Sequence, residues 1–344
     1  MVDIRELSNS DLQYWLQDNN IPIYRSKQIY NWLWKRNANS FDEMMNLPKN
    51  LQDILKRHFS LKKILIDRKD QSKDKSIKYI FRLYDDLFVE GVIIPAKSRI
   101  TACISSQVGC GLGCKFCATG SLGLERNLSA AEIFDQVAIL NMEACNLFLK
   151  PLTNIVVMGM GEPLQNYHNV MTALEHICSP EGMGISTRRI TISTAGVVKM
   201  IRKLALEKVP YRLAVSLHSA IDSKRCKLMP VGVNNNIAKL TGALAFYQNK
   251  LDKKITFEYL LLNGINDSDE DAEALIKLCR QLFCKVNIID FNFVDGLKYK
   301  RPSEQKIIAF IHKLEIAKIQ VTRRRSKGDD IGAACGQLSL QYKY

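Results

Sequence analysis

From about residue 99 onward, short apolar runs alternate with amphipathic stretches, and this alternation constrains the fold more than any other feature. Strands and helices that follow one another in this way pack as βα units around a parallel sheet. The expected strands are residues 100–105, 154–158, 189–193, 211–217, 255–262, 286–291 and 320–325. The expected helices are residues 130–140, 170–177, 197–206, 237–249, 269–283 and 304–317. Six βα units predict an α/β fold, either a barrel-like sheet or a doubly wound open sheet, with functional loops after the strands.

The chain before residue 99 has a different pattern. Its first part predicts a small helical accessory domain that is rich in aromatic and basic residues. A basic linker follows, and then two strands, residues 79–83 and 87–94, which form a β-hairpin that turns at Asp85 and Asp86. The predicted divisions of the chain are 1–60, 61–98, 99–327 and a C-terminal tail, 328–344.

A glycine-rich loop after the strand at 100–105 holds Cys110, Cys114 and Cys117 in the spacing C-x3-C-x2-C. Three thiolates this close can ligate three irons of one cubane cluster, and no fourth cysteine follows nearby, so one iron stays open. A disulfide framework is the first alternative, but the chain shows no signal peptide. A zinc knuckle needs a fourth ligand, and buried core cysteines do not explain the glycines. We therefore predict an iron–sulfur cluster here.

The charge balance points to a polyanionic partner. The 344 residues include 49 Lys and Arg against 35 Asp and Glu, a net charge of +14. Nucleic acid is the simplest such partner, and a solubilising surface charge is the alternative. Basic residues gather at 62–78, 298–301 and 323–325, where they suit phosphate groups. No apolar run is long enough to span a bilayer, so we expect a cytoplasmic protein with reduced thiols and no membrane partner.

The loops after the predicted strands contain most of the candidate ligand-binding residues. Gly161 and Glu162 lie in Gly-Met-Gly-Glu-Pro after the strand at 154–158, where the backbone can approach a ligand and a carboxylate suits an ammonium group. By itself, His218 is better interpreted as a satisfied core histidine. Its position at a strand end favours a ligand contact instead. The other candidates at strand ends are Ser193, Ser216, Leu217 and Asn292.

Two cysteines outside the loop lie at positions where a thiol could take part in a reaction. Cys103 lies on the strand that leads into the loop, so it is expected near the mouth or interior of the sheet. Cys335 lies in a glycine- and alanine-rich tail, where small neighbours leave a thiol accessible, as a nucleophile requires. The remaining cysteines are expected to pack in the fold: Cys145, Cys178, Cys226, Cys279 and Cys284.

The cysteine loop and the Gly-Met-Gly-Glu-Pro run together resemble the radical S-adenosylmethionine (radical SAM) enzymes. This resemblance implies a partial (βα)6 barrel, which favours the barrel over the open sheet. It implies a [4Fe-4S] cluster held by Cys110, Cys114 and Cys117, with SAM bound to the open iron. It also implies one-electron cleavage of SAM to a 5′-deoxyadenosyl radical.

A longer set of motifs resembles the RlmN-type RNA methyltransferases. These motifs are residues 24–29, 103–110, 115–120, 159–164, 216–218 and 328–338. The resemblance implies methylation of C2 of an adenine in 23S rRNA, and of the adenine 3′ to the anticodon in some tRNAs. The accessory domain would then dock RNA. A flavodoxin or ferredoxin would supply electrons to what we expect to be a monomer.

The same resemblance assigns roles to individual residues. Cys335 would carry the methyl group, Glu90 would accept the C2 proton, and Cys103 would release a covalent RNA adduct by forming a disulfide. The implied SAM contacts are Gly161, Glu162, Ser193, Ser216, Leu217, His218 and Asn292. One departure follows Asn292, where residues 293–298 replace a proline-rich stretch of the family.

Three alternatives differ from this interpretation in chemistry. Cfr-type enzymes share both extra cysteines and methylate C8 of the same rRNA adenine. Glu162 is followed here by Pro163 and Leu164, whereas Cfr-type chains tend to have alanine after the glutamate. A non-catalytic iron–sulfur protein that binds RNA is the alternative from another class. A methylthiotransferase would need a second cysteine cluster, which the sequence lacks.

Overall fold

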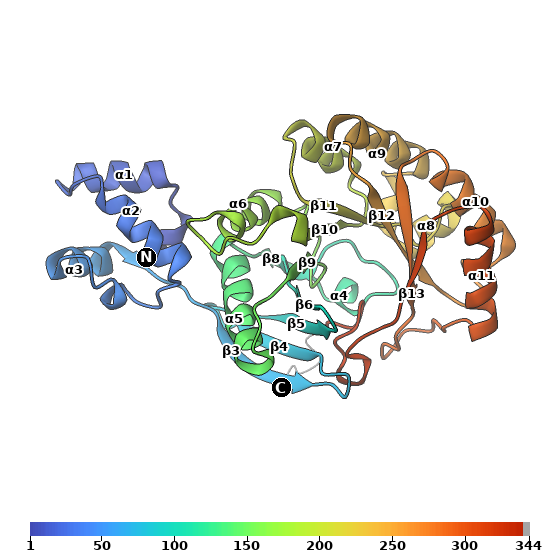
Figure 1. Cartoon of the computed structure of the whole chain (residues 1–344), viewed down its shortest axis with the longest axis horizontal. Helices are drawn as coiled ribbons and strands as arrows, with labels where there is room; N and C mark the ends of the chain where they lie inside the picture. The colour runs from blue at the N-terminus through green and yellow to red at the C-terminus, as the bar shows by residue number, and fades with distance from the viewer. Residues whose placement is uncertain (340–344) are drawn as a thin grey trace.

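Ten strands form one mixed sheet in the computed structural model, which describes residues 1–339 (Figure 1). The strand order is β14-β13-β12-β11-β10-β9-β6-β5-β4-β3. Neighbouring strands from β14 to β6 are parallel, and β5, β4 and β3 continue the sheet in antiparallel pairs. Because β14 pairs with β13, and β6 pairs with β9 and β5, the parallel strands form an open, partial barrel.

Strands and helices alternate along the barrel as the sequence predicts. The strands are β6 (Arg99–Cys103), β9 (Asn154–Val157), β10 (Ile190–Thr194), β11 (Arg212–Ser216), β12 (Ile255–Leu261), β13 (Cys284–Asp290) and β14 (Val321–Arg324). The helices are α5 (Ala130–Phe148), α6 (Tyr167–Cys178), α7 (Val198–Leu206), α8 (Asp222–Leu228), α9 (Ile237–Leu251), α10 (Asp269–Cys279) and α11 (Glu304–Ile316). The helices cover the outer face of the sheet, and most residues of the barrel strands are buried or half-buried (Figure 1). The predicted partial (βα)6 barrel is confirmed.

Short elements fill the connections between these units. The cysteine loop is flanked by a two-stranded sheet of β7 (Gln107–Cys110) and β8 (Gly123–Asn127), with α4 (Ala118–Ser121) between them. The short 3-10 turns are η1 (Ile4–Glu6), η3 (Phe41–Glu43), η4 (Thr187–Arg189), η5 (Pro230–Val233) and η6 (Asp329–Ile331). Of the helices that the structure describes, none combines the length and the apolar character needed to cross a bilayer.

The hairpin extension has one strand more than the sequence predicts. The expected pair is present as β4 (Ile77–Arg82) and β5 (Phe88–Ala96), and Asp86 takes a left-handed φ of 59° in the turn. The predicted basic linker, however, contains β3 (Leu65–Gln71), which pairs with β4. Most side chains of β3 are exposed or half-buried, so the strand lacks the two-residue alternation of apolar and polar residues that marks a half-buried strand.

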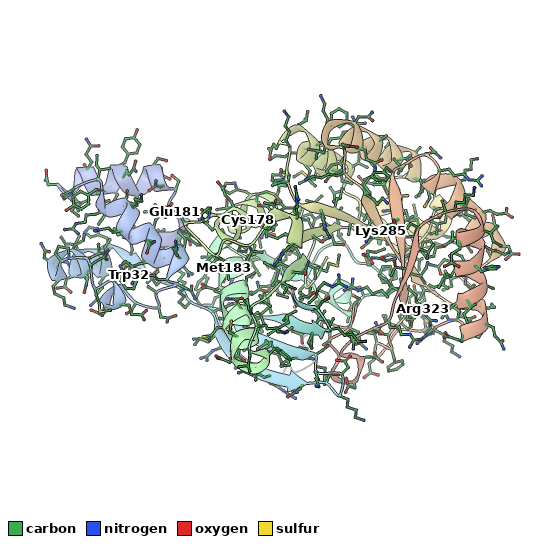
Figure 2. The ribbon with its side chains drawn as sticks, in the orientation of Figure 1. Trp32, Cys178, Glu181, Met183, Lys285 and Arg323 are labelled. Atoms are coloured by element: carbon green, nitrogen blue, oxygen red, sulfur yellow. The ribbon has the colours of Figure 1, made fainter. Side chains whose placement is uncertain are left out.

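The N-terminal helical unit contains α1 (Asn9–Asp18), α2 (Arg25–Tyr30), a π-helical turn η2 (Asn31–Lys35) and α3 (Lys49–His58). A short parallel pair, β1 (Val2–Asp3) and β2 (Phe59–Ser60), joins its two ends. Trp32 lies within this unit, whereas Cys178, Glu181 and Met183 lie where the unit meets the barrel (Figure 2). The predicted helical accessory domain is confirmed.

Two side chains of this unit, Trp34 and Arg5, contact helices of the barrel. Trp34 stacks on His176 of α6 with ring centroids 3.8 Å apart, and it meets Phe134 of α5 edge-on. The Arg5 guanidinium donates to both carboxylate oxygens of Asp135 on α5 at 2.8 Å, and both side chains are buried. Burial beside the tryptophan lowers the pKa of His176 to about 4. The helical unit and the barrel therefore share a buried polar and aromatic interface.

Candidate active site

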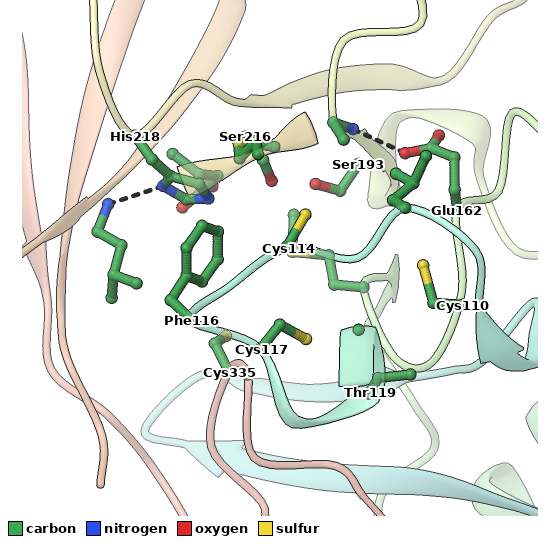
Figure 3. A pocket seen from close by; sticks show the side chains of 18 of the residues that line it. Cys110, Cys114, Phe116, Cys117, Thr119, Glu162, Ser193, Ser216, His218 and Cys335 are labelled. Carbon is green, nitrogen blue, oxygen red and sulfur yellow. Dashed lines mark hydrogen bonds between the residues drawn. The ribbon is translucent and has the colours of Figure 1, made fainter. Parts of the chain in front are cut away.

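A cavity of about 930 Å³ opens at the carboxyl ends of the parallel strands (Figure 3). Its walls come from the cysteine loop, from the ends of β9 to β13, and from the segment after β14. The predicted site residues that line it are Cys110, Cys114, Cys117, Gly161, Glu162, Ser193, Ser216, His218 and Cys335. In βα barrels this end of the sheet is where active sites lie.

The cysteine loop is held by backbone contacts that require small residues. The Lys115 N–H donates to the Leu228 carbonyl at 2.9 Å, and the Cys117 N–H donates to the Cys114 carbonyl at 3.2 Å. A Cβ at Gly120 would lie 2.8 Å from the Cys114 carbonyl oxygen, so only glycine permits this approach. The loop therefore holds its three thiols at one end of the cavity.

The thiols fit a cubane cluster better than a single ion. Among residues 1–339, no three Cys, His, Asp or Glu side chains converge as ligands of one metal ion. In a cubane each thiolate binds a different iron, so convergence on one point is not required. Burial raises the pKa of Cys110 to about 11, and it also raises the pKa values of Cys114 and Cys117. Three half-buried thiolates this close together need a positive partner, which the irons of a cluster would supply.

Glu162 has a buried carboxylate that no cationic side chain pairs with in the described hydrogen bonds and ion pairs. Its Oε2 accepts from the Ala195 N–H at 2.7 Å (Figure 3). Its Oε1 accepts from the Leu164 N–H at 3.1 Å. Burial raises the pKa of Glu162 to about 7. Gly161 lies next to it with φ +97°, and a Cβ there would strike Gln107 at 2.5 Å. A carboxylate fixed in this way suits the ammonium group of a ligand.

His218 combines the core and the ligand interpretations. Its Nδ1 accepts from the Leu260 N–H at 2.9 Å, so the ring proton of the neutral form lies on Nε2. Burial lowers the pKa of His218 to about 3. The Phe116 ring packs edge-on against the imidazole, with the two ring centroids 4.6 Å apart. Nε2 remains a donor for a ligand in the cavity. Ser193 and Ser216 line the same wall (Figure 3).

Leu217 and Asn292 do not line this cavity. The Leu217 side chain is fully buried in the core, and its N–H and carbonyl are bonded to Glu258 and Ser219. Asn292 is buried, and its Nδ2 donates to the Cys335 carbonyl at 3.3 Å. In this structure Asn292 therefore contacts the backbone of the tail thiol.

A second cavity, of about 740 Å³, adjoins the first and contains both extra thiols. Cys103 is buried at the end of β6, the strand on which it was expected near the mouth or interior of the sheet. Cys335 is exposed, in line with the accessible thiol expected there. Cys335 lines both cavities, and it lies beside Cys117 in Figure 3. Burial raises the pKa of Cys103 to about 12, with a smaller contribution in the same direction from Cys335 and an opposing one from Arg324.

Glu90 lies on β5, beside the strand that carries Cys103. Val92 of β5 is the register partner of Cys103. Glu90 is buried, its Oε2 accepts from the Ser339 N–H at 3.0 Å, and its Oε1 lies 3.6 Å from the Lys78 ammonium. It lines neither cavity.

The three arginines at 323–325, which were predicted to bind phosphate, have different surroundings in the structure. Arg323 forms ion pairs with Asp290 and Glu304, beside α11 (Figure 2). Arg324 lines both cavities, and Arg325 lines the second. Successive side chains of a strand point to opposite faces, and that alternation on β14 could have indicated the inward position of Arg324.

Sequence reasoning missed other residues of the first cavity. Glu258 lines it and carried no motif signal, whereas Phe116 lies in the 115–120 motif but was assigned no role. Among the cysteines expected to pack, Cys279 is buried, but Cys145 is exposed on α5. A helical position alone does not reveal which face of α5 meets solvent.

Comparisons with known proteins agree with this fold and site. The model of the Radical SAM superfamily matches residues 104–279. The crystal structure of a radical SAM methyltransferase from Sphaerobacter thermophilus has a TM-score of 0.92 and 40% sequence identity, over 98% of this chain and 99% of that chain. The chain is thus a radical SAM protein. Proteins of this superfamily use a [4Fe-4S] cluster and SAM, which the three thiols and the Glu162 wall fit.

The relatives narrow the assignment further. A model described as the ribosomal RNA large subunit methyltransferase N-terminal domain matches residues 2–61. A probable dual-specificity RNA methyltransferase RlmN from Flavobacterium johnsoniae is 45% identical, over 98% of this chain and 97% of the relative. The dual-specificity RNA methyltransferase RlmN of Campylobacter jejuni is 44% identical, over 94% of each. The chain belongs to the RlmN family.

Proposed function

We propose that this protein methylates C2 of an adenine in RNA, in 23S rRNA and at the tRNA position 3′ to the anticodon. The observation that carries the proposal is the position of Cys335. Its thiol borders both the cavity of the three loop cysteines and the cavity of Cys103. One sulfur can therefore receive a group in one cavity and deliver it in the other. The names of the 44–45% identical relatives support RNA as the acceptor.

A carrier thiol suits the chemistry of adenine C2. This carbon is electron-poor and does not attack the methyl group of SAM as a nucleophile. When bound, the cluster and SAM supply a methyl donor and a route to one-electron hydrogen abstraction. The Cys335 thiolate takes the methyl group, forming an S–C bond as the sulfonium S–C bond breaks. The loop cysteines and Glu162 hold the cofactors beside this thiol.

Release from the carrier requires a second thiol and a base. Loss of a hydrogen atom to the 5′-deoxyadenosyl radical, which bound SAM would supply, leaves a carbon radical on the methylated Cys335, and this carbon bonds to C2. The adduct then gives up one electron, for which the bound cluster, oxidised when SAM is cleaved, would be the acceptor, and the C2 proton, which Glu90 accepts. Cys103 attacks the Cys335 sulfur, the C–S bond breaks, and its electron pair takes up a proton as the product methyl group. A Cys103–Cys335 disulfide remains for reduction.

The basic surface suits the RNA backbone. Arg325 and Lys327 line the second cavity, close to the two thiols. The net charge of +14 favours phosphate contacts, and the target base would leave its stack to reach the cavity. An RNA substrate implies a cytoplasmic location, a flavodoxin or ferredoxin suits the electron supply, and a monomer suffices because one chain supplies every proposed residue.

Mass spectrometry of RNA nucleosides tests the proposal. Holoenzyme reconstituted without oxygen is incubated with SAM, a reductant and unmodified RNA. We expect 2-methyladenosine, and none with the Cys335→Ala variant. Formation of 8-methyladenosine alone would assign the chain to the Cfr-type reaction and overturn the proposal.

A further inference from the structure

The segment that carries Cys335 is held at two distant points. We call residues 328–338 the Cys335 loop and residues 72–76, which join β3 to β4, the β3–β4 turn. At the thiol end, the Ala118 N–H donates to the Gly336 carbonyl at 2.8 Å, and Asn292 Nδ2 donates to the Cys335 carbonyl. The other end of the loop meets the β3–β4 turn, which belongs to the hairpin extension and not to the barrel.

Three hydrogen bonds join the loop to the turn. The Ser72 hydroxyl donates to Asp330 Oδ1 at 2.6 Å, and the Lys73 N–H donates to Asp330 Oδ2 at 3.1 Å. In the opposite direction, the Gly328 N–H donates to Asp74 Oδ2 at 2.9 Å. Each segment thus offers a carboxylate to donors of the other. These hydrogen bonds to Ser72 and the Lys73 N–H lower the pKa of Asp330, so it is ionised and accepts strongly at neutral pH.

The backbone at the base of the Cys335 loop, around Gly328, is closely packed. Gly328 has φ +71°, and a Cβ there would lie 2.8 Å from Ala333 Cβ and 3.5 Å from Ser76 Cβ. The Ala333 N–H donates to the Gly328 carbonyl at 2.8 Å, which closes the loop on itself. Displacement of the loop base would therefore move the residues that precede Cys335.

The carboxamide of Gln337 links the base of the loop to its thiol end. Gln337 Nε2 donates to Asp329 Oδ1 at 2.7 Å and to the Phe293 carbonyl at 2.9 Å. Its Oε1 accepts from the Ala334 N–H at 3.0 Å, one residue before the thiol. If Asp330 moved, its neighbour Asp329 would move with it, and the hydrogen bonds of Gln337 to Asp329 and Ala334 would displace the backbone beside Cys335.

We infer that Ser72 and Asp330 are positioning residues, which anchor the Cys335 loop so that its thiol stays at the junction of the two cavities. The hairpin extension then has a role in the reaction, although it lies outside the barrel. The role of that junction in the reaction rests on the proposed function. The anchoring of the Cys335 loop by Ser72 and Asp330 does not depend on that function.

Hydrogen–deuterium exchange of the full-length holoenzyme measures the anchor directly. The variants are Ser72→Ala, Asp330→Ala and their combination. Asp295→Ala is the matched control, because it removes the same charge at a position close to the Cys335 loop. Within residues 1–339, the structure shows no hydrogen bond or ion pair of the Asp295 side chain. Ser72→Ala is expected to speed amide exchange in residues 328–338 roughly threefold to tenfold, which is the net effect of one hydrogen bond. Asp330→Ala also removes the hydrogen bond from the Lys73 N–H, so its effect should be larger. The combined variant should match Asp330→Ala, since the Ser72–Asp330 hydrogen bond is already absent in that variant.

A second readout connects the anchor to chemistry. The rate of S-methylation of Cys335 by SAM should fall in both single variants, while iron content and the thermal midpoint stay at wild-type values. Wild-type exchange in both variants, or additive effects in the combined one, would overturn the inference. If wild-type Cys335 never gained a methyl group but exchange rose as expected, the proposed function would fail and the anchor would stand.

Discussion

Cys103 and Cys335 line the same cavity, although one ends the strand β6 and the other follows β14, the last strand of the parallel series. An open barrel makes this possible. Because β14 does not pair with β6, the segment after β14 can turn inward across the carboxyl ends of the strands. The two thiols are therefore brought together by the incomplete closure of the sheet.

Replacing Cys103 should trap the reaction after the adduct has formed. The Cys103→Ala variant retains Cys335 but lacks the thiol that attacks its sulfur. We expect a covalent protein–RNA species that persists in a denaturing gel and disappears with ribonuclease. Cys145→Ala, which removes an exposed cysteine on α5, should turn over as the wild type does. Free methylated RNA from Cys103→Ala at the wild-type rate would exclude the assigned role.

Glu162→Gln should weaken SAM binding without unfolding the barrel. The amide has one acceptor oxygen, whereas the carboxylate accepts from both Ala195 and Leu164 and also offers a negative charge. We expect the dissociation constant of SAM to rise at least about tenfold, as for loss of a charge-assisted hydrogen bond. Equilibrium dialysis of reconstituted protein measures it. Glu181→Gln, at the exposed surface near the helical unit, is the control and should bind as the wild type does (Figure 2).

Local signals in the sequence predicted most of the barrel and the three-thiol loop. The Ser129 capping box, for example, marks the start of α5 because its partner Glu132 is only three residues away. Contacts between distant residues left no such signal. Arg5 and Asp135 are 130 positions apart, and Ser72 and Asp330 are 258 apart, so no periodicity relates them. The strand β3 was missed because it has no apolar face.

Asp135→Asn should destabilise the junction between the helical unit and the barrel. Arg5 and Lys63 both pair with Asp135, and the Arg5 side chain is fully buried. Arg5 keeps its ion pair with Asp3, so removing the Asp135 charge weakens the site without leaving the guanidinium unpaired. We expect a loss of about 1.5–3 kcal/mol, as for a hydrogen bond to a charged group. Chemical denaturation measures the change. Asp42→Asn removes ion pairs between exposed side chains and should leave the denaturation midpoint unchanged.

His176 should make the same junction sensitive to acid. Its pKa of about 4 lies below the ordinary 6.5, so the unfolded chain binds a proton first as the pH falls. The stability it contributes is therefore complete above about pH 6.5 and is lost as the pH falls toward 4. His176→Phe keeps a ring against Trp34 and cannot titrate. Between about pH 7 and pH 5, the wild type should lose roughly 1–2 kcal/mol more stability than this variant. Equal losses would contradict the account.

The central claim is that Cys335 carries the methyl group. The starting protein is holoenzyme that was assembled without oxygen and whose Cys335 is unmethylated. It is incubated with SAM that bears a deuterated methyl group, and its peptides are then analysed by mass spectrometry. The account predicts a deuterated methyl group on the peptide that contains Cys335, and none on the peptide that contains Cys103. A label on RNA with an unmethylated Cys335 at every time point would contradict it.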